Sequence, residues 1–395
     1  MTGDRRTNVP LVIVALSAAA AFNLGAGLGL SILRPGAADD FETVRAWCAD
    51  WLFHGTRLYG VVGGGTDYPP NAIVFFSPLA LVPSYLAVPL WSLLMLALTP
   101  VLALFVIRSS NIPARRAAVA IATLLFCCWG GTRFYLQFTC LSLTFAFAAM
   151  ILMDSRPDIS GACLGIALAK PHIAGPIALW TLLMKRTRVV LVAASVALVA
   201  WLIYDARVTS SPLDTIARWV GVLQTLYGGP DALIGRTSVR PLVAALVPGT
   251  DWDDAAWVAT AAALVVVPGT MTWRDAGRPV SPRSFAAAST FCLWSLLSVF
   301  HNGHNFLLAL PAFVFLLLVD DPPSRIWRWA VAGAMEIVLV VDAPIHVAPL
   351  LTPGSLAAIV AENADRLVVL MAFVAVTLVW RRLDQAAIAT SPATS

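Results

Sequence analysis

Two aspartates, Asp39 and Asp40, open the segment "AADDFETVRAWCADWLFHG" and are the first candidates for acid–base chemistry. An aspartate at the start of a helix accepts hydrogen bonds from free backbone amides and suits the positive end of the helix dipole. One aspartate is enough for that task, so the other carboxylate is available to remove a proton from a hydroxyl. The residues alone leave helix cap and general base as open alternatives.

Lys170, in "GIALAKPHIAGP", is the only lysine inside an apolar stretch, and Pro171 follows it directly. An ionisable residue in a membrane segment is costly and by default indicates function. A lysine can bind a phosphate as a point charge. The alternative is a lysine at a helix end whose amine extends to the membrane interface.

His301 and His304 flank an Asn-Gly turn in "FHNGHNF". The turn explains the Asn-Gly pair, but it does not explain two histidines three residues apart. A zinc site needs further ligands that the sequence does not supply, so we expect no metal. Donation of a hydrogen bond to an anion or to a leaving oxygen is the expected role of the two rings.

Three arginines lie in connectors expected on the outer side of a membrane. Arg133 belongs to "GGTRFYLQFT" together with Gln137, and Arg236 and Arg240 flank Ser238 in "GRTSVRP". Arginine forms strong paired hydrogen bonds with phosphates, so we expect these side chains to contact a lipid or donor phosphate. A plain interfacial role is the alternative.

The composition shows which kind of protein must position these residues. The chain has 395 residues, of which 59% are hydrophobic and 12% charged, whereas a soluble protein carries about 25% charged residues. Long apolar runs predict an all-α polytopic membrane protein with about twelve transmembrane helices. The net charge of +4 is spread between these runs and does not form a nucleic-acid patch. The predicted spans are 10–32, 85–107, 116–130, 138–153, 159–170, 172–184, 189–204, 252–272, 285–300, 305–319, 327–341 and 365–381.

The distribution of arginine predicts the orientation. Most basic residues fall in alternate connectors, which places both termini in the cytoplasm. This alternation holds only if segment 71–83 does not cross. As a helix that segment would rise only about 20 Å, against a hydrocarbon core of ~30 Å. We therefore expect a short re-entrant helix, aimed by Tyr68, Pro69 and Pro70 at an outer cavity, with Gln137 and Ser238 also lining that cavity.

One domain accounts for the whole chain. Residues 1–384 form a single membrane-embedded domain with outer loops at 33–84 and 205–251, and residues 385–395 form a flexible cytoplasmic tail. The first outer loop carries an amphipathic juxtamembrane helix that ends at Gly55, with an apolar stripe of Phe41, Val44, Trp47, Trp51 and Leu52.

Four motifs occur together in order: an acidic residue after the first span, "LYG…YPP", "GIALAKP", and a histidine before "NFLLALP". This set resembles glycosyltransferase family 87, which contains mannosyl- and arabinosyltransferases that use polyprenyl-phosphate sugars. The resemblance runs from about Asp39 to Pro311. It implies a GT-C fold with the active site on the outer face. It favours Asp40 over Asp39 as the base, His304 over His301 beside the donor phosphate, and Lys170 as the hairpin lysine.

The resemblance also implies a substrate class and a location. The donor would be a polyprenyl-phosphate sugar, with a mannose-like hexose favoured over arabinofuranose, and the acceptor a hydroxyl of a lipid-linked or envelope glycan. No nucleotide, cofactor or divalent metal is expected, and we expect a monomer in a bacterial plasma membrane. Many members have Gly-Gln-x-Asn where this chain has Leu136 to Thr139, and an Asn before the serine at Ser238. These departures concern the acceptor and the sugar.

Two other functions remain as alternatives. About twelve spans with both termini inside is also typical of secondary transporters, but these often have two similar halves and carry charges near the midplane. The two halves of this chain do not resemble each other. A flippase for lipid-linked sugars would need a polar path, for which only Lys170 and Glu336 are candidates.

Overall fold

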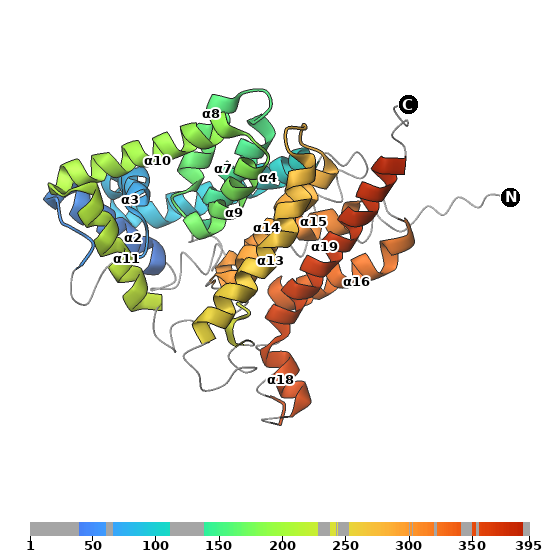
Figure 1. The fold of residues 1–395 in the computed structure, drawn as a ribbon. Helices are drawn as coiled ribbons and strands as arrows, with labels where there is room; N and C mark the ends of the chain where they lie inside the picture. Colours follow the sequence, from blue (N-terminus) through green and yellow to red (C-terminus); the bar gives the residue numbers. More distant parts are fainter. Residues whose placement is uncertain are drawn as a thin grey trace.

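The computed structural model describes residues 39–60, 66–110, 138–227, 238–241, 243, 253–299, 301, 303–319, 322–340, 350–352 and 355–389. All regular secondary structure in these residues is helical, as predicted (Figure 1). The predicted spans at 10–32 and 116–130 lie outside the described residues.

The segment predicted to be the first outer loop begins with helix α2 (Asp39–His54) and continues through α3 (Pro70–Phe76) and the 3₁₀ turn η1 (Ser77–Leu81) into α4 (Ser84–Ser110). Gly55 ends α2 as predicted, because its φ of +64° belongs to the left-handed region that favours glycine. The α3–η1 segment meets α4 at a bend of 119°. Such a bend fits either a broken span or a re-entrant segment, so the re-entrant helix stays a prediction.

The apolar stripe of α2 packs against protein. Phe41 stacks on Trp91 of α4 with 5.2 Å between ring centroids, and Trp51 stacks on Tyr204 at 5.8 Å. Both Phe41 and Trp51 are buried. The sequence had placed this face on the membrane surface, because helical periodicity identifies an apolar face but not the material that covers it.

Four consecutive helices follow the predicted spans within a few residues. They are α7 (Thr139–Leu152), α8 (Pro157–Ala167), α9 (Pro171–Leu183) and α10 (Thr187–Val208). Helix α8 lies directly against α10, since a Cβ atom placed on Gly161 would lie 2.5 Å from the Val192 Cβ. Gly165 makes the same close approach, with 2.7 Å to the Val196 Cβ. Small residues of this kind allow close helix packing in membranes.

The C-terminal part adds α11 (Pro212–Tyr227), α13 (Asp253–Asp275), α14 (Pro282–Ser298), η2 (Gly303–Ala309), α15 (Leu310–Leu318), η3 (Pro322–Ser324), α16 (Arg325–Met335), a π turn (Glu336–Val340), α18 (Leu356–Glu362) and α19 (Ala364–Ala389). Helices α13, α14 and α19 lie side by side (Figure 1). Helix α19 continues to Ala389, beyond residue 385 where the flexible tail was predicted to begin.

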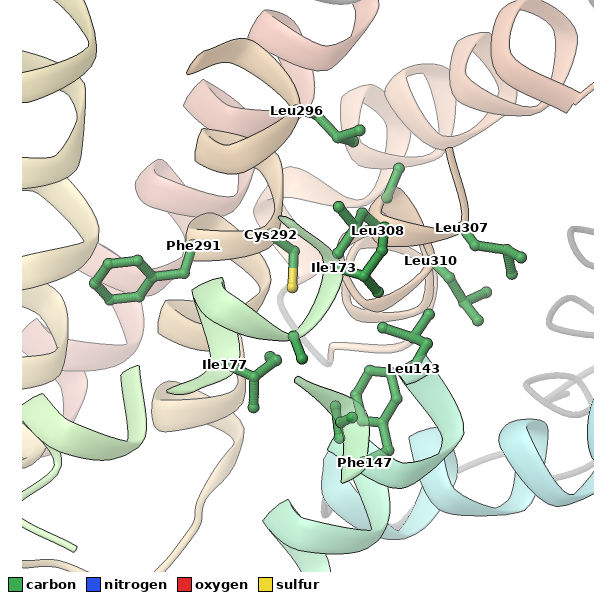
Figure 2. Close-up of a cluster of buried hydrophobic side chains, with 14 of the residues drawn as sticks. Leu143, Phe147, Ile173, Ile177, Phe291, Cys292, Leu296, Leu307, Leu308 and Leu310 are labelled. Carbon is green, nitrogen blue, oxygen red and sulfur yellow. The ribbon is translucent and has the colours of Figure 1, made fainter. Parts of the chain in front are cut away.

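Helix α14 is the centre of the core. Its residues from Ser284 to Ser298 are nearly all buried. Figure 2 shows apolar side chains of α14 meeting those of α7, α9 and the η2–α15 segment: Leu143, Phe147, Ile173, Ile177, Phe291, Cys292, Leu296, Leu307, Leu308 and Leu310. These contacts fix the position of the start of α9 relative to the end of α14.

Ion pairs gather at one end of the helices. Arg186 pairs with Asp154 at 2.6 Å and Arg188 with Asp158 at 2.7 Å. Arg283 contacts Asp275 at 2.9 Å and Asp384 at 2.8 Å. We call this the charged end. These residues belong to the connectors for which a cytoplasmic location was predicted.

The opposite end contains the start of α7, the start of α9 and the end of α14, since each of these helices has its other terminus at the charged end. In the described residues, two helices are long and apolar enough to cross a membrane, Thr187–Val208 and Ala255–Asp275, or three if the bent pair is one span. The number of about twelve spans stays a prediction.

Candidate active site

Lys170 lies in the tight turn between α8 and α9, opposite the charged end. The turn forms because α8 ends at Ala167 and Pro171 begins α9, so the amide of Lys170 donates to the Ala167 carbonyl at 3.1 Å. The side chain is 3% exposed, and its Nζ donates to the Thr139 Oγ1 at 2.8 Å. Nζ also lies 6.0 Å from the centre of the Tyr68 ring. The amine therefore points into the protein, which excludes the alternative of an amine that extends to the interface.

Thr139 connects Lys170 to a third part of the chain. Its hydroxyl accepts from Lys170 and donates to the Asn305 Oδ1 at 3.0 Å. Residues 139, 170 and 305 thus meet, although they lie far apart in the sequence. Neither Thr139 nor Asn305 was among the site residues predicted from the sequence. A signal existed for Asn305, which begins the motif "NFLLALP" on which the family resemblance rested, whereas Thr139 lies where the chain departs from the family pattern.

The negative charges of two carboxylates favour the charged form of the Lys170 amine. Asp67, in the loop before α3, has the larger effect, and Asp40, the second residue of α2, has the smaller. Asp67 is half-buried and Asp40 is exposed. The sequence pattern pointed to Asp40 but not to Asp67, which is adjacent to Tyr68. Helix α2 begins at Asp39, whose side chain lies outside the described residues.

The loop that carries Asp67 and Tyr68 is held by hydrogen bonds from several directions. The Trp219 Nε1 of α11 donates to the Asp67 carbonyl at 3.0 Å, and the Tyr59 hydroxyl donates to the Tyr68 carbonyl at 2.8 Å. The Tyr68 amide donates to the Thr66 Oγ1 at 3.1 Å. Burial and the nearby negative charges raise the pKa of Tyr59, so this hydroxyl keeps its proton for the bond to Tyr68.

Pro69, Pro70 and Tyr68 set the direction of α3. Pro69 has extended φ and ψ of −69° and 159°, and Pro70 occupies the first turn of the helix. The Tyr68 ring then packs edge-on against Phe138 at 5.8 Å, while Phe76 at the end of α3 stacks on Phe138 at 3.8 Å. This aromatic contact joins α3 to the start of α7, directly beside Thr139.

His301 is fully buried in the turn after α14, between the predicted spans 285–300 and 305–319. Its ring lies 5.4 Å from the His172 ring at an interplanar angle of 62°. Its Nε2 lies 3.1 Å from the Ser295 carbonyl oxygen and 3.2 Å from the Ser295 Oγ. Burial, with a smaller contribution from the charge of Lys170, lowers the pKa of His301 to about 3. The ring is therefore neutral at physiological pH. The His304 side chain lies outside the described residues.

Ser238 and Arg240 join the same end of α14. The Val239 amide donates to the Leu297 carbonyl at 2.9 Å, and the Arg366 Nε of α19 donates to the Ser238 carbonyl at 3.0 Å. The Arg240 guanidinium lies 5.9 Å from the Trp257 ring. These contacts are with α13, α14 and α19. Arg133, Gln137 and Arg236 lie outside the described residues.

No group of three or more His, Cys, Asp or Glu residues within the described part of the chain is placed to hold a metal ion. The polar groups that meet here are the Lys170 ammonium, the Thr139 hydroxyl and the Asn305 amide, and the negative charges of Asp67 and Asp40 are close enough to influence the ammonium. This combination suits an anionic group held next to a base.

A model of glycosyltransferase family 87 matches residues 66–299, which is more than half of the chain. The chain belongs to glycosyltransferase family 87. The match begins at the loop of Asp67 and Tyr68, includes Lys170, and ends at the last turn of α14. Family 87 membership makes the chain a membrane glycosyltransferase, which favours glycosyl transfer over the transporter and flippase alternatives. No curated protein and no solved structure gives a significant match.

Proposed function

We propose that this family 87 enzyme moves a sugar from a polyprenyl phosphate to a hydroxyl of a lipid-linked or cell-envelope glycan. The buried ammonium of Lys170 carries this proposal, because a buried charge bonded to the Thr139 hydroxyl at 2.8 Å and influenced by the charges of Asp67 and Asp40 needs a functional reason. The donor is a phosphodiester with one negative charge. When its bond to the sugar breaks, the phosphate gains a second charge, which a buried cation stabilises.

Asp40 acts as the base in this reaction. It takes the proton of the acceptor hydroxyl while that oxygen attacks the anomeric carbon, and the bond from this carbon to the phosphate oxygen breaks. The products are the glycosylated acceptor and polyprenyl phosphate. Asp40 suits the task because it is exposed and therefore accessible to an incoming hydroxyl, whereas the half-buried Asp67 acts more strongly on Lys170.

The location and substrate follow from the same arrangement. By the positive-inside rule the charged end and both termini face the cytoplasm, which puts Lys170 and Asp40 at the outer face of a bacterial plasma membrane. We propose that the chain crosses the membrane about twelve times and acts as a monomer. We favour mannose or a similar hexose over arabinofuranose. The reaction needs no cofactor and no divalent metal, because Lys170 supplies the positive charge.

The test is sugar transfer by the purified enzyme in proteoliposomes that contain both polyprenyl-phosphate mannose with a radiolabelled sugar and an extract of envelope glycolipids as acceptors. Wild type releases polyprenyl phosphate, and Asp40→Asn lowers the rate by about 10²–10⁴-fold while the protein stays folded. Asp50→Asn is the matched control, since Asp50 is exposed on the same helix α2 and has no place in the reaction. Unchanged turnover in Asp40→Asn would remove the assigned base. If wild type consumes neither a mannosyl nor an arabinofuranosyl donor, the donor class is wrong.

A further inference from the structure

One nitrogen of the His301 ring is hydrogen-bonded, and the other has no hydrogen-bond partner among the described residues. Its Nε2 contacts both the carbonyl oxygen and the Oγ of Ser295. Its Nδ1 is fully buried and has no hydrogen-bond partner among the described residues. Buried polar atoms are nearly always paired in proteins, so an unpaired nitrogen in the centre of the fold needs an explanation.

The partners of Nε2 determine which nitrogen carries the proton. A carbonyl oxygen only accepts, so the contact at 3.1 Å to the Ser295 carbonyl requires a proton on Nε2. The Ser295 hydroxyl gives its own proton to the His172 carbonyl at 3.1 Å, so its oxygen also accepts from Nε2. Protonation of Nε2 thus satisfies all of these contacts. Nδ1 is then left with a bare lone pair, and it can only accept.

Burial and a nearby positive charge keep Nδ1 unprotonated. Burial and the charge of Lys170 both oppose a second proton on the ring. A neutral acceptor does not bind an ionised phosphate, because both groups would present lone pairs. This differs from the role predicted from the sequence, in which His301 donates to the donor phosphate.

His301 is close to the part of the site that would hold the substrate. Its ring packs on His172, two residues after Lys170, and the charge of Lys170 acts on it. Asn305, four residues after His301, is bonded to Thr139 and through it to Lys170. A phosphate bound at Lys170 would therefore place the attached sugar within the region of these side chains.

We propose that the Nδ1 atom of His301 accepts a hydrogen bond from a hydroxyl of the sugar that is transferred. This inference rests on the proposed function and adds a residue that selects the sugar. A site built to hydrogen-bond a hydroxyl strongly rejects the analogue that lacks it, because the buried acceptor is then left unpaired. His301 thus recognises a hydroxyl of the sugar, whereas Lys170 binds the phosphate.

The experiment compares polyprenyl-phosphate mannose with its 2-, 3-, 4- and 6-deoxy analogues in the proteoliposome assay. For wild type, one analogue loses about 10²-fold or more in kcat/KM relative to mannose. In His301→Phe the mannose donor falls to a similar level, and the same analogue is no longer distinguished from mannose. Ser289→Ala is the matched control, because this buried serine of α14 bonds only within its own helix, to the Phe285 carbonyl at 2.8 Å. It keeps the wild-type discrimination.

Two further measurements keep the test decisive. His301→Gln retains a donor for Ser295 and an acceptor for the sugar, so it restores part of the discrimination even if His301→Phe does not fold. Binding of polyprenyl phosphate without a sugar is unchanged in His301→Gln and in folded His301→Phe. Weaker binding of this probe would assign His301 to the phosphate and overturn the inference.

The remaining outcomes separate this inference from the proposed function. If wild type transfers mannose but discriminates against no deoxy analogue, Nδ1 pairs with water only, and the inference fails while the proposed function stands. If discrimination persists unchanged in His301→Phe, another residue selects the hydroxyl. If wild type consumes neither a mannosyl nor an arabinofuranosyl donor, both the function and the inference fail.

Discussion

Replacement of Lys170 by methionine tests the electrostatic part of the site. Methionine fills a similar volume without the charge, and Thr139 keeps its hydrogen bond to Asn305 at 3.0 Å. The Lys170 side chain is 3% exposed, so water cannot replace its charge. Loss of one preorganised group that stabilises a developing charge costs about 3–4 kcal/mol in the transition state, which corresponds to a fall of about 10²–10³-fold in kcat.

The effect should appear mainly in kcat. The donor phosphate carries one charge when bound and two when the sugar leaves, so the interaction with Lys170 grows during the reaction. The KM for the donor rises less, because only the first charge is present in the bound state. Single-turnover release of polyprenyl phosphate in proteoliposomes separates the two constants.

Lys170→Arg is the matched variant. It keeps the positive charge but replaces a compact ammonium with a longer planar group, so it should retain part of the activity lost in Lys170→Met. A Lys170→Met enzyme with kcat within about threefold of wild type would refute the reasoning, since it lies far outside the range expected for a buried catalytic charge. A rise in KM alone, with kcat unchanged, would also contradict it.

Three further predictions concern the scaffold. Gly165→Ala should lower stability by about 1–3 kcal/mol in thermal unfolding, because the new Cβ would lie 2.7 Å from the Val196 Cβ; Gly175→Ala on α9, with nothing within 4 Å, should have little effect. Trp219→Phe removes the donor to the Asp67 carbonyl and should slow turnover by about 10-fold through a displaced loop; an unaltered rate would show that this bond does not position Asp67. Burial raises the pKa of the Cys48 thiol to about 12, so the thiol ionises only in the unfolded chain when pH exceeds the ordinary value of 9.0, and stability falls between these pH values. Mass spectrometry should find Cys48 unmodified by maleimide at pH 9 until detergent unfolds the protein, and rapid labelling of the folded protein would contradict its burial.

The sequence predicted those features of the fold that depend on local rules. The turn at Lys170 follows from Pro171 directly after a short apolar run, and the end of α2 follows from Gly55. The ends of α7, α9 and α10 follow from apolar runs bounded by charges or prolines. What covers an apolar face does not follow from periodicity, so the burial of Phe41 against Trp91 became visible only in the structure.

The candidate site was only partly predictable for a similar reason. Lys170 stands out because a buried charge is costly wherever it occurs. Thr139, Asn305 and Asp67 are short polar residues with many ordinary roles at helix ends and turns. Their importance comes from the contact of three distant segments at Lys170, and this contact depends on the packing of α7, α9 and α14 rather than on any local signal.

The position of a bound polyprenyl phosphate tests the central claim most directly. In an experimental structure of the enzyme with this lipid, we predict a phosphate oxygen about 2.7–2.9 Å from the Lys170 Nζ, the distance of a charge-assisted hydrogen bond. Asp40 should lie on the same side of the phosphate as the space for the sugar. A phosphate bound at the charged end, near Arg186 or Arg283, with Lys170 still bonded only to protein, would contradict the assignment of Lys170 and the outer-face active site.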